Sequence, residues 1–274
     1  MNASKWMLTA LTAAFLVGGH STAQAQSGAP SYWQDVQKRG VLRCGAAIAP
    51  PYVIRDTQSG QYSGVFVDLC REFGEKVLGV KVEMVDTSWD NIVAGLQSGR
   101  WDVAMALNRT PKRSLAVAYS RSAWDYEIDG LYDRANPKFQ KAPKSLDDVD
   151  KAGTTIAVVS GTAADQLLTA KVKKATMLRL PDVDATRLAL SSRRADIYFD
   201  DADLNSPFAA TDSKRWETLH PQPAIAKQGI AYALRRNATE ADLQTLDIFI
   251  EDKLAVGEVS ALGKSYMQKV SAPK

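Results

Sequence analysis

Histidine and cysteine are scarce in this chain of 274 residues, which contains two of each. His20 lies in an N-terminal segment that we expect to be removed, so His220 is the one histidine left for chemistry. A single histidine cannot build a multi-ligand metal cluster, and every Ser-His-Asp or Cys-His mechanism would depend on it. His220 lies beside Pro221 and Pro223 in a connecting segment. We therefore expect a surface histidine, no metal site and no cofactor.

A long hydrophobic run is also missing. The apolar stretch from Trp6 to Val17 has about a dozen residues, below the roughly 18 that a membrane span needs. It follows Lys5 and precedes Ala23-Gln24-Ala25, a small-x-small pattern typical of cleavage by signal peptidase. These features predict a secretory signal peptide over residues 1–25, cleavage after Ala25 and a periplasmic protein, in preference to a membrane anchor.

Neither sign of charge dominates the remaining chain. Lys5 is the one charged residue of segment 1–25, so its removal lowers the net charge from +3 to +2. The basic residues form no tail or stripe, and we therefore expect no nucleic-acid partner. Removing 25 of the 274 residues leaves 249, enough for one large or two medium domains.

The two cysteines, Cys44 and Cys70, both follow the expected cleavage site. In an oxidising compartment a disulfide between them would tie the first strand to the first long helix. Two separate buried thiols are the alternative, because sequence spacing does not establish the Cα separation that a disulfide needs. The sequence leaves both possibilities open.

Helix and strand patterns alternate along the first half of the chain. Residues 64–79 carry apolar side chains at helical spacing before a glycine, and residues 80–85 alternate as a strand. Extended segments are expected at 114–119 and 126–132 and strands at 154–159, 177–180, 196–201 and 229–234. Helices are expected from the turn at 160–162 through Leu168 and at 182–191, 239–254 and 260–269. This alternation predicts an α/β fold with mostly parallel sheets flanked by helices. We expect two lobes, 26–125 plus 227–274 and 126–226, with crossings near 125 and 225.

The stretch from residue 89 to residue 113 contains a predicted helix, a buried strand and a turn. Asp90 is expected to cap the helix and Gly99 to end it. Thr110 before Pro111 predicts a second helix start, which would hold Arg113 at the end of a strand. Open α/β sheets bind ligands at such strand ends, and an arginine there favours an anion.

Several motifs together resemble one known family. Each is weak alone, but their order and spacing are specific and cover nearly the whole chain after residue 25. They are Gly64-Val65-Phe66-Val67-Asp68-Leu69, Trp89 with Leu96-Gln97-Ser98-Gly99 and Asp102, Thr110-Pro111-Lys112-Arg113, Ala118-Tyr119-Ser120, Ser160-Gly161-Thr162, and Arg194-Ala195-Asp196 with Asp201. The chain is similar to family 3 of the extracellular solute-binding proteins, the periplasmic amino-acid-binding proteins of ABC importers. The resemblance implies a two-lobed periplasmic binding protein fold of the type II kind.

The resemblance implies how the first lobe would contact a ligand. Arg113 would pair with the ligand α-carboxylate, since a guanidinium fits a carboxylate bidentately. Asn108 stands where relatives usually carry Ser or Thr, and the Ala106 carbonyl would accept from the ligand ammonium. Trp89 would cover the ligand as an aromatic platform, and Tyr52 would form a weaker second wall.

The second lobe would complete a clamp for a zwitterion. The N–H and hydroxyl of Thr162 and the N–H of Ala163 would donate at a helix N-terminus. Asp201 would balance the ligand ammonium. The alternative is that Asp200 and Asp201 form a solvated loop pair. Asp200 could also attract a basic ligand side chain and Arg109 an acidic one, and their roles stay open.

Three functions fit these residues. The first, which is not enzymatic, is capture of an amino acid or similar zwitterion by a monomer that delivers it to an ABC permease. The second is a dehydratase-like periplasmic enzyme on the same fold, with acid or base groups from Asp200, Asp201 and Arg109. The third is an accessory binding protein of another exported system, with a degenerate pocket. The sequence does not identify the ligand.

Overall fold

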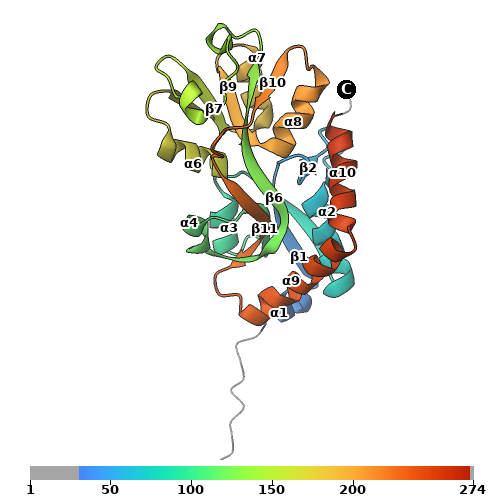
Figure 1. Ribbon diagram of the computed structural model, residues 1–274. Coiled ribbons are helices and arrows are strands. Elements are labelled where there is room, and N and C mark those ends of the chain that lie inside the picture. The colour runs from blue at the N-terminus through green and yellow to red at the C-terminus, as the bar shows by residue number, and fades with distance from the viewer. Residues whose placement is uncertain (1–30, 272–274) are drawn as a thin grey trace, which may run out of the picture. The chain divides into compact units, whose positions relative to one another are not determined.

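The computed structural model describes residues 31–271, so the predicted signal peptide lies outside the described residues. None of the helices in this range is long and apolar enough to cross a membrane. The elements are drawn in Figure 1. They are α1 (Tyr32–Arg39), β1 (Val41–Ala47), β2 (Ile54–Arg55), β3 (Tyr62–Ser63), α2 (Val65–Glu72), the π-helix η1 (Phe73–Val77), β4 (Lys81–Thr87), α3 (Ile92–Gln97), β5 (Val103–Asn108), α4 (Pro111–Ser114), β6 (Val117–Asp133), the 3₁₀-helix η2 (Pro137–Phe139), α5 (Leu146–Val149), β7 (Thr155–Val159), α6 (Ala163–Lys171), β8 (Thr176–Leu180), α7 (Val183–Ser191), β9 (Ile197–Asp201), α8 (Ala202–Thr211), β10 (Trp216–Leu219), β11 (Lys227–Arg235), α9 (Glu240–Ala255) and α10 (Glu258–Ser271).

Two groups of parallel strands are joined by antiparallel ones. In the first lobe β1 pairs in parallel with both β4 and β5, and in the second lobe β7 pairs in parallel with both β8 and β9. Strand β6 pairs antiparallel with β11 over its first part and with β9 and β10 over its last part. It therefore passes from one lobe to the other, as Figure 1 shows. The two-lobed α/β fold predicted from the sequence is confirmed.

The chain passes between the lobes once within β6 and again between β10 and β11. The residues from 221 to 226 on the return path form no helix or strand. The exact lobe boundaries near 125 and 225 stay predictions.

Local sequence signals account for most helix ends. Gly40 follows α1 in the left-handed conformation, and the Thr110 hydroxyl caps α4 by accepting from the backbone N–H of Arg113. One expected cap is wrong. Asn91 stands at the start of α3 without a side-chain cap, while the Asp90 carboxylate accepts from the hydroxyl of Ser160 in the second lobe. The Asp90 side chain therefore bonds to a residue of the second lobe and not to the N-terminus of α3.

Three elements of the middle region differ from the sequence expectation. The separate extended segments 114–119 and 126–132 belong largely to one strand, β6, and α8 and β10 were not expected. Helix α8 contains Pro207 and has a weak apolar stripe, so helical periodicity does not reveal it. Its start is instead capped by Asp201, whose carboxylate accepts from the N–H of Asp203.

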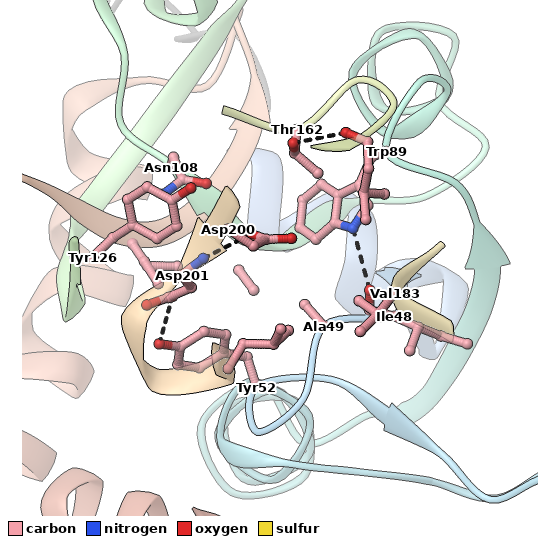
Figure 2. A pocket seen from close by; sticks show the side chains of 14 residues that line it. Ile48, Ala49, Tyr52, Trp89, Asn108, Tyr126, Thr162, Val183, Asp200 and Asp201 are labelled. Carbon is pink, nitrogen blue, oxygen red and sulfur yellow. Dashed lines mark hydrogen bonds between the residues drawn. The ribbon is translucent and has the colours of Figure 1, made fainter. Parts of the chain in front are cut away.

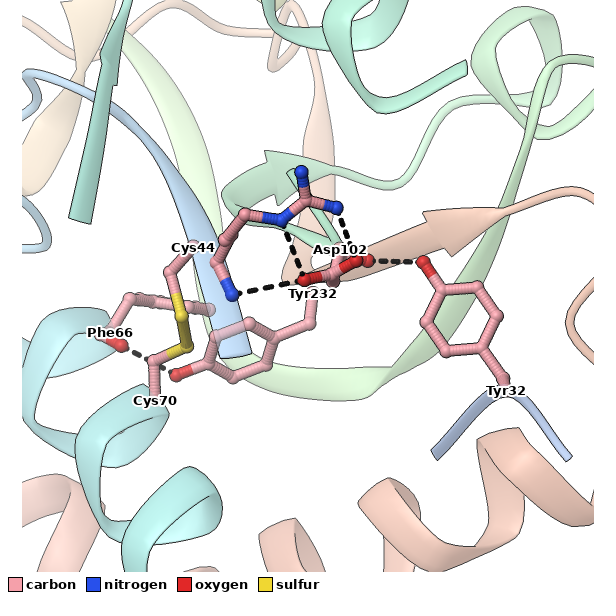
Figure 3. The surroundings of a disulfide bond; sticks show 7 residues. Tyr32, Cys44, Phe66, Cys70, Asp102 and Tyr232 are labelled. Carbon is pink, nitrogen blue, oxygen red and sulfur yellow. Dashed lines mark hydrogen bonds and ion pairs between the residues drawn. A yellow bond between two sulfur atoms is a disulfide. The ribbon is translucent and has the colours of Figure 1, made fainter. Parts of the chain in front are cut away.

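Cys44 of β1 and Cys70 of α2 are joined by a disulfide bond (Figure 3). Both cysteines are buried within the core of the first lobe. Close by, the Tyr232 hydroxyl of β11 donates to the Phe66 carbonyl at 2.7 Å. These contacts fix α2 against the sheet, and the N-terminus of α2 faces the loop that carries Tyr52.

The buried carboxylate of Asp102 pairs with arginines of the first lobe. Its fully buried carboxylate accepts from the backbone N–H, Nε and Nη2 of Arg43 at 2.9–3.1 Å. Arg39 lies 2.7 Å and Arg235 3.8 Å from the same carboxylate. Burial alone would raise the pKa of Asp102, but the bonds from Arg43 and the charges of Arg43 and Arg39 outweigh it, so the pKa lies below the usual value.

Replacing Asp102 by Asn is expected to destabilise the fold by about 3 kcal/mol at neutral pH, since three arginines lose a buried counter-ion. Because the folded pKa is depressed, the carboxylate stabilises the fold above its unfolded pKa of about 3.9 and loses this effect as pH falls through the folded pKa. The difference between wild type and Asp102→Asn should therefore shrink in acid. Urea unfolding at several pH values measures it.

A matched control is Asp86→Asn. Asp86 also pairs with an arginine, Arg55 at 3.4 Å, but its side chain is 58% exposed. Its replacement is expected to change stability by no more than about 0.5 kcal/mol. Equal losses in the two variants would contradict the role given to Asp102.

Candidate functional site

A cavity of about 440 Å³, counted with its mouth, is lined by residues of both lobes (Figure 2). Most of its walls follow the carboxyl ends of strands, the position where open α/β sheets bind ligands. From the first lobe and the crossing strands come Ile48, Ala49, Tyr52, Trp89, Ala106, Asn108, Tyr126 and Ile230, and from the second lobe come Val159, Thr162, Val183, Asp200, Asp201 and Leu204.

Among the residues predicted for the site, Tyr52, Trp89, Ala106, Asn108, Thr162 and Asp201 line this cavity. Arg113 and Ala163 are not part of its lining. Ala163 is the first residue of α6, directly after Thr162. Arg113 lies beside the same turn, because its Nη2 donates to the Gly161 carbonyl at 2.9 Å.

Arg113 is held in place and is buried. Pro111 opens α4, the Thr110 cap fixes the first turn, and only 6% of Arg113 is exposed. Burial lowers the pKa of Arg113, yet guanidinium remains charged at neutral pH. Its Nη1 is buried without a hydrogen-bond partner. A charged donor left unpaired in this way favours an anionic ligand.

The end of β5 supplies a second unpaired donor. Asn108 is buried, and its amide Nδ2 has no hydrogen-bond partner. Its backbone carbonyl accepts from the Tyr119 hydroxyl at 2.7 Å, which holds this residue in place. Two positions earlier, Ala106 has a φ of 56°, in the left-handed region that favours glycine. The pairing of β5 with β11 shifts register here, so the strand is irregular where it lines the cavity.

Tyr52 is anchored on the N-terminus of α2. The N–H groups of Val65 and Phe66 donate to the carbonyls of Pro51 and Tyr52. Gly64 permits this approach, because its φ is 120° and a Cβ there would lie 2.4 Å from the Tyr52 carbonyl oxygen. The Tyr52 hydroxyl then reaches the second lobe and donates to Asp201 Oδ2 at 2.8 Å.

Trp89 forms another wall of the cavity and is half-buried. Its indole Nε1 donates to the Ile48 carbonyl at 3.2 Å, as the dashed line in Figure 2 marks. This bond fixes the ring across the loop that follows β1. The position suits an aromatic surface that covers an aliphatic or cationic group.

Thr162 uses its side chain and its backbone N–H within its own turn, and its role toward a ligand stays a prediction. Its hydroxyl donates to the Val159 carbonyl at 2.8 Å and accepts from the N–H of Asp165, while its own N–H donates to Val159 at 3.4 Å. These donors are used within the turn and the cap of α6. The adjacent Gly161 packs against Asp90 of the first lobe, where a Cβ would lie 2.6 Å from the carboxylate.

The idea of a solvated pair at Asp200 and Asp201 is wrong, because both side chains are buried. Burial raises the pKa of Asp201 well above its usual value, and the charge of Asp203 adds to this, while the bond from Tyr52 opposes it. Burial also raises the pKa of Asp200, which accepts from the Tyr198 hydroxyl at 2.6 Å. The nearby charge of Arg187 lowers the pKa of Asp200. Arg187 and Tyr198 both belong to the second lobe, so Asp200 interacts with groups of its own lobe.

Some residues were missed or lie elsewhere. Tyr126 lines the cavity from the middle of β6, and Val183 and Leu204 line it from α7 and α8, but none carries a motif that marks it. Arg109 is exposed, and its side chain donates a long bond of 3.4 Å to Ser122. His220 is largely exposed and lies 2.5 Å from the buried Asp129. Within residues 31–271, His, Cys, Asp and Glu side chains form no group of three or more that could hold a metal ion.

Known proteins resemble this chain over most of its length. Cyclohexadienyl dehydratase of Pseudomonas aeruginosa is 26% identical over 239 residues, which are 85% of this chain and 83% of that protein. The general L-amino acid-binding periplasmic protein AapJ of Rhizobium johnstonii is 27% identical over 256 residues, which are 89% of this chain and 70% of that protein.

Solved structures share the fold. The ancestral amino acid-binding protein AncCDT-1, described as a precursor of cyclohexadienyl dehydratase, matches with a TM-score of 0.75 at 26% identity, over 86% of this chain and 99% of that chain. A Streptococcus pneumoniae amino acid ABC transporter substrate-binding protein bound to L-arginine matches with a TM-score of 0.74 over 88% of this chain and 98% of that chain. Its identity of 21% supports the fold alone.

A family model matches residues 42–269, well over half of the chain. The motifs quoted from the sequence, from Gly64 to Asp201, all fall inside this range. The chain therefore belongs to the bacterial extracellular solute-binding proteins, family 3.

Proposed function

We propose that this protein captures an amino acid or a similar small zwitterion between its two lobes. One observation carries the proposal: a buried carboxyl group and an unpaired amide line the cavity, and an unpaired guanidinium nitrogen lies beside the turn that carries Thr162. Arg113 Nη1 and Asn108 Nδ2 are unpartnered donors on the first lobe, and Asp201 is a buried carboxylate on the second. An α-carboxylate would satisfy the donors, and an α-ammonium would satisfy Asp201.

The energetics are adequate for such a ligand. A hydrogen bond that involves a charged group contributes about 1.5–3 kcal/mol, and micromolar affinity corresponds to roughly 8 kcal/mol. Pairing at each end of the ligand, with aliphatic surface covered by Trp89, would reach this range. The ligand would add to the contacts that already hold the lobes together, because it touches both of them.

Family membership supports the wider role. We infer that the protein is exported by the predicted signal peptide, works as a periplasmic monomer and hands its ligand to an ABC permease. A thermal-shift screen of the amino acids and related carboxylates tests the binding function directly. A rise in melting temperature with at least one amino acid is expected, whereas no response to any of them would favour the accessory-protein alternative.

Arg113→Ala is expected to weaken amino-acid binding by about 100-fold or more, because the α-carboxylate loses its charged partner. Isothermal titration calorimetry measures the affinity, and thermal unfolding checks that the fold survives. Arg109→Ala is the matched control, since Arg109 lies four residues earlier, between β5 and α4, and is exposed. Undiminished affinity in Arg113→Ala would contradict the carboxylate assignment.

Binding is expected to release a proton at pH values below the raised pKa of Asp201. The raised pKa of Asp201 means that the free protein holds a proton there below that pKa, and a ligand ammonium favours the ionised form. The groups that face Asp201 are Tyr52 of the first lobe, Asp203 of α8 and Asp200 of β9. Affinity should therefore fall as pH decreases.

Calorimetry in buffers of different ionisation enthalpy measures this release. In Asp201→Asn the proton release should disappear together with most of the affinity. A binding heat that is independent of the buffer throughout the acidic range would refute the assignment of Asp201 to the ammonium.

The alternative of a dehydratase rests on the similarity to cyclohexadienyl dehydratase and on the two buried carboxyl groups. A carboxyl whose pKa is raised can act as a general acid. The residues that line the cavity include no lysine, histidine or glutamate, so the acid and base groups available there are Asp200, Asp201, Tyr52 and Tyr126. A turnover assay with prephenate-like substrates separates the functions, and we expect no product. Turnover that is lost in Asp201→Asn would replace the binding proposal.

A further inference from the structure

Asp203 connects three elements that meet beside the cavity. It lies in the first turn of α8, and its Oδ2 accepts from the Trp124 indole at 2.7 Å and from the Tyr52 hydroxyl at 3.2 Å. Its backbone N–H donates to Asp201 Oδ1 at 3.1 Å. One short side chain of the second lobe is therefore bonded to the loop after β1 and to the crossing strand β6.

Both partners of Asp203 are set in the first lobe. Trp124 pairs with Ile230 of β11, and its ring packs so closely on Gly263 of α10 that a Cβ there would lie 2.0 Å away. The rings of Tyr52 and Trp124 are 6.1 Å apart and in edge contact. Since the Trp124 indole N–H donates to the Asp203 carboxylate, this contact is charge-assisted. It stabilises the closed arrangement of the lobes.

The Tyr52 hydroxyl carries one proton and faces two carboxylates. It lies 2.8 Å from Asp201 Oδ2 and 3.2 Å from Asp203 Oδ2, so it can donate to only one of them at a time. A ligand ammonium at Asp201 would compete for the same oxygen. Asp203 then provides an acceptor within reach, and the buried hydroxyl keeps a hydrogen bond while Asp201 turns to the ligand.

We propose that Asp203 is a positioning residue for ligand capture, which latches the lobes through Trp124 and gives Tyr52 a second acceptor so that Asp201 can bind an ammonium. The second part rests on the proposed function, whereas the latch does not. Helix capping does not explain Asp203, because the cap of α8 is Asp201 and the side-chain bonds of Asp203 cross to the other lobe.

Asp203→Ala tests the latch in the unliganded protein. Small-angle X-ray scattering should match the closed structure for wild type and show a larger radius of gyration for the variant. Asp212→Ala is the matched control, because Asp212 lies at the other end of α8 and its carboxylate accepts only a local bond from the N–H of Arg215. Asp203→Asn should open less, since its amide oxygen still accepts from Trp124.

Stopped-flow kinetics with the amino acid identified by the thermal-shift screen tests the second part. In Asp203→Ala the release rate should rise about tenfold, the size expected from one lost bond to a charged group, with a smaller change in the association rate. Tyr52→Phe and Trp124→Phe each remove one donor and should open the lobes as well. They keep the test decisive if Asp203→Ala fails to fold.

The outcomes separate the two proposals. If no amino acid binds wild type, the proposed function fails, but opening in Asp203→Ala and not in Asp212→Ala still supports the latch. An unchanged scattering profile in Asp203→Ala, a lower melting temperature without opening, or a wild-type profile that does not fit the closed structure would each overturn the latch. Opening with an unchanged release rate would overturn the role of Asp203 in freeing Asp201.

Discussion

Strand β6 pairs antiparallel first with β11 and then with β9, and this continuous strand organises both lobes. One continuous strand serves both lobes, so the parallel strands of each lobe end facing a shared space. Tyr126 lies on this strand at the cavity, and Trp124 lies two residues before it on the path between the lobes. The site is therefore built around the connection and not added to one lobe.

Polar groups that are buried between the two lobes lose their hydrogen bonds to water, so each of them needs a new partner. Three hydrogen bonds between the lobes supply some of these partners, from Arg113 to Gly161, from Ser160 to Asp90 and from Tyr52 to Asp201. Arg113 Nη1 and Asn108 Nδ2 remain without a hydrogen-bond partner. An arrangement of this kind favours a ligand with a negative and a positive end, because each end relieves a buried group.

The order of elements could be predicted from the sequence because it is written in local patterns. The 64–79 stripe, the Thr110-Pro111 start and the turn before Thr162 all rely on neighbours within a few residues. The same local reasoning failed where a distant partner competed. Asp90 bonds to Ser160 instead of capping α3.

Local patterns in the sequence predict the α/β class, the strand ends that carry polar residues and, through the motif resemblance, six of the fourteen residues that line the cavity. The tertiary fold sets the hydrogen-bond partners and the exposure of those side chains. It buried Asp200 and Asp201, gave Asp200 partners within its own lobe and brought Asp203 to Tyr52 and Trp124. The physical reason is that hydrogen bonding and desolvation depend on which distant groups meet, whereas helices, strands and caps depend mainly on adjacent residues.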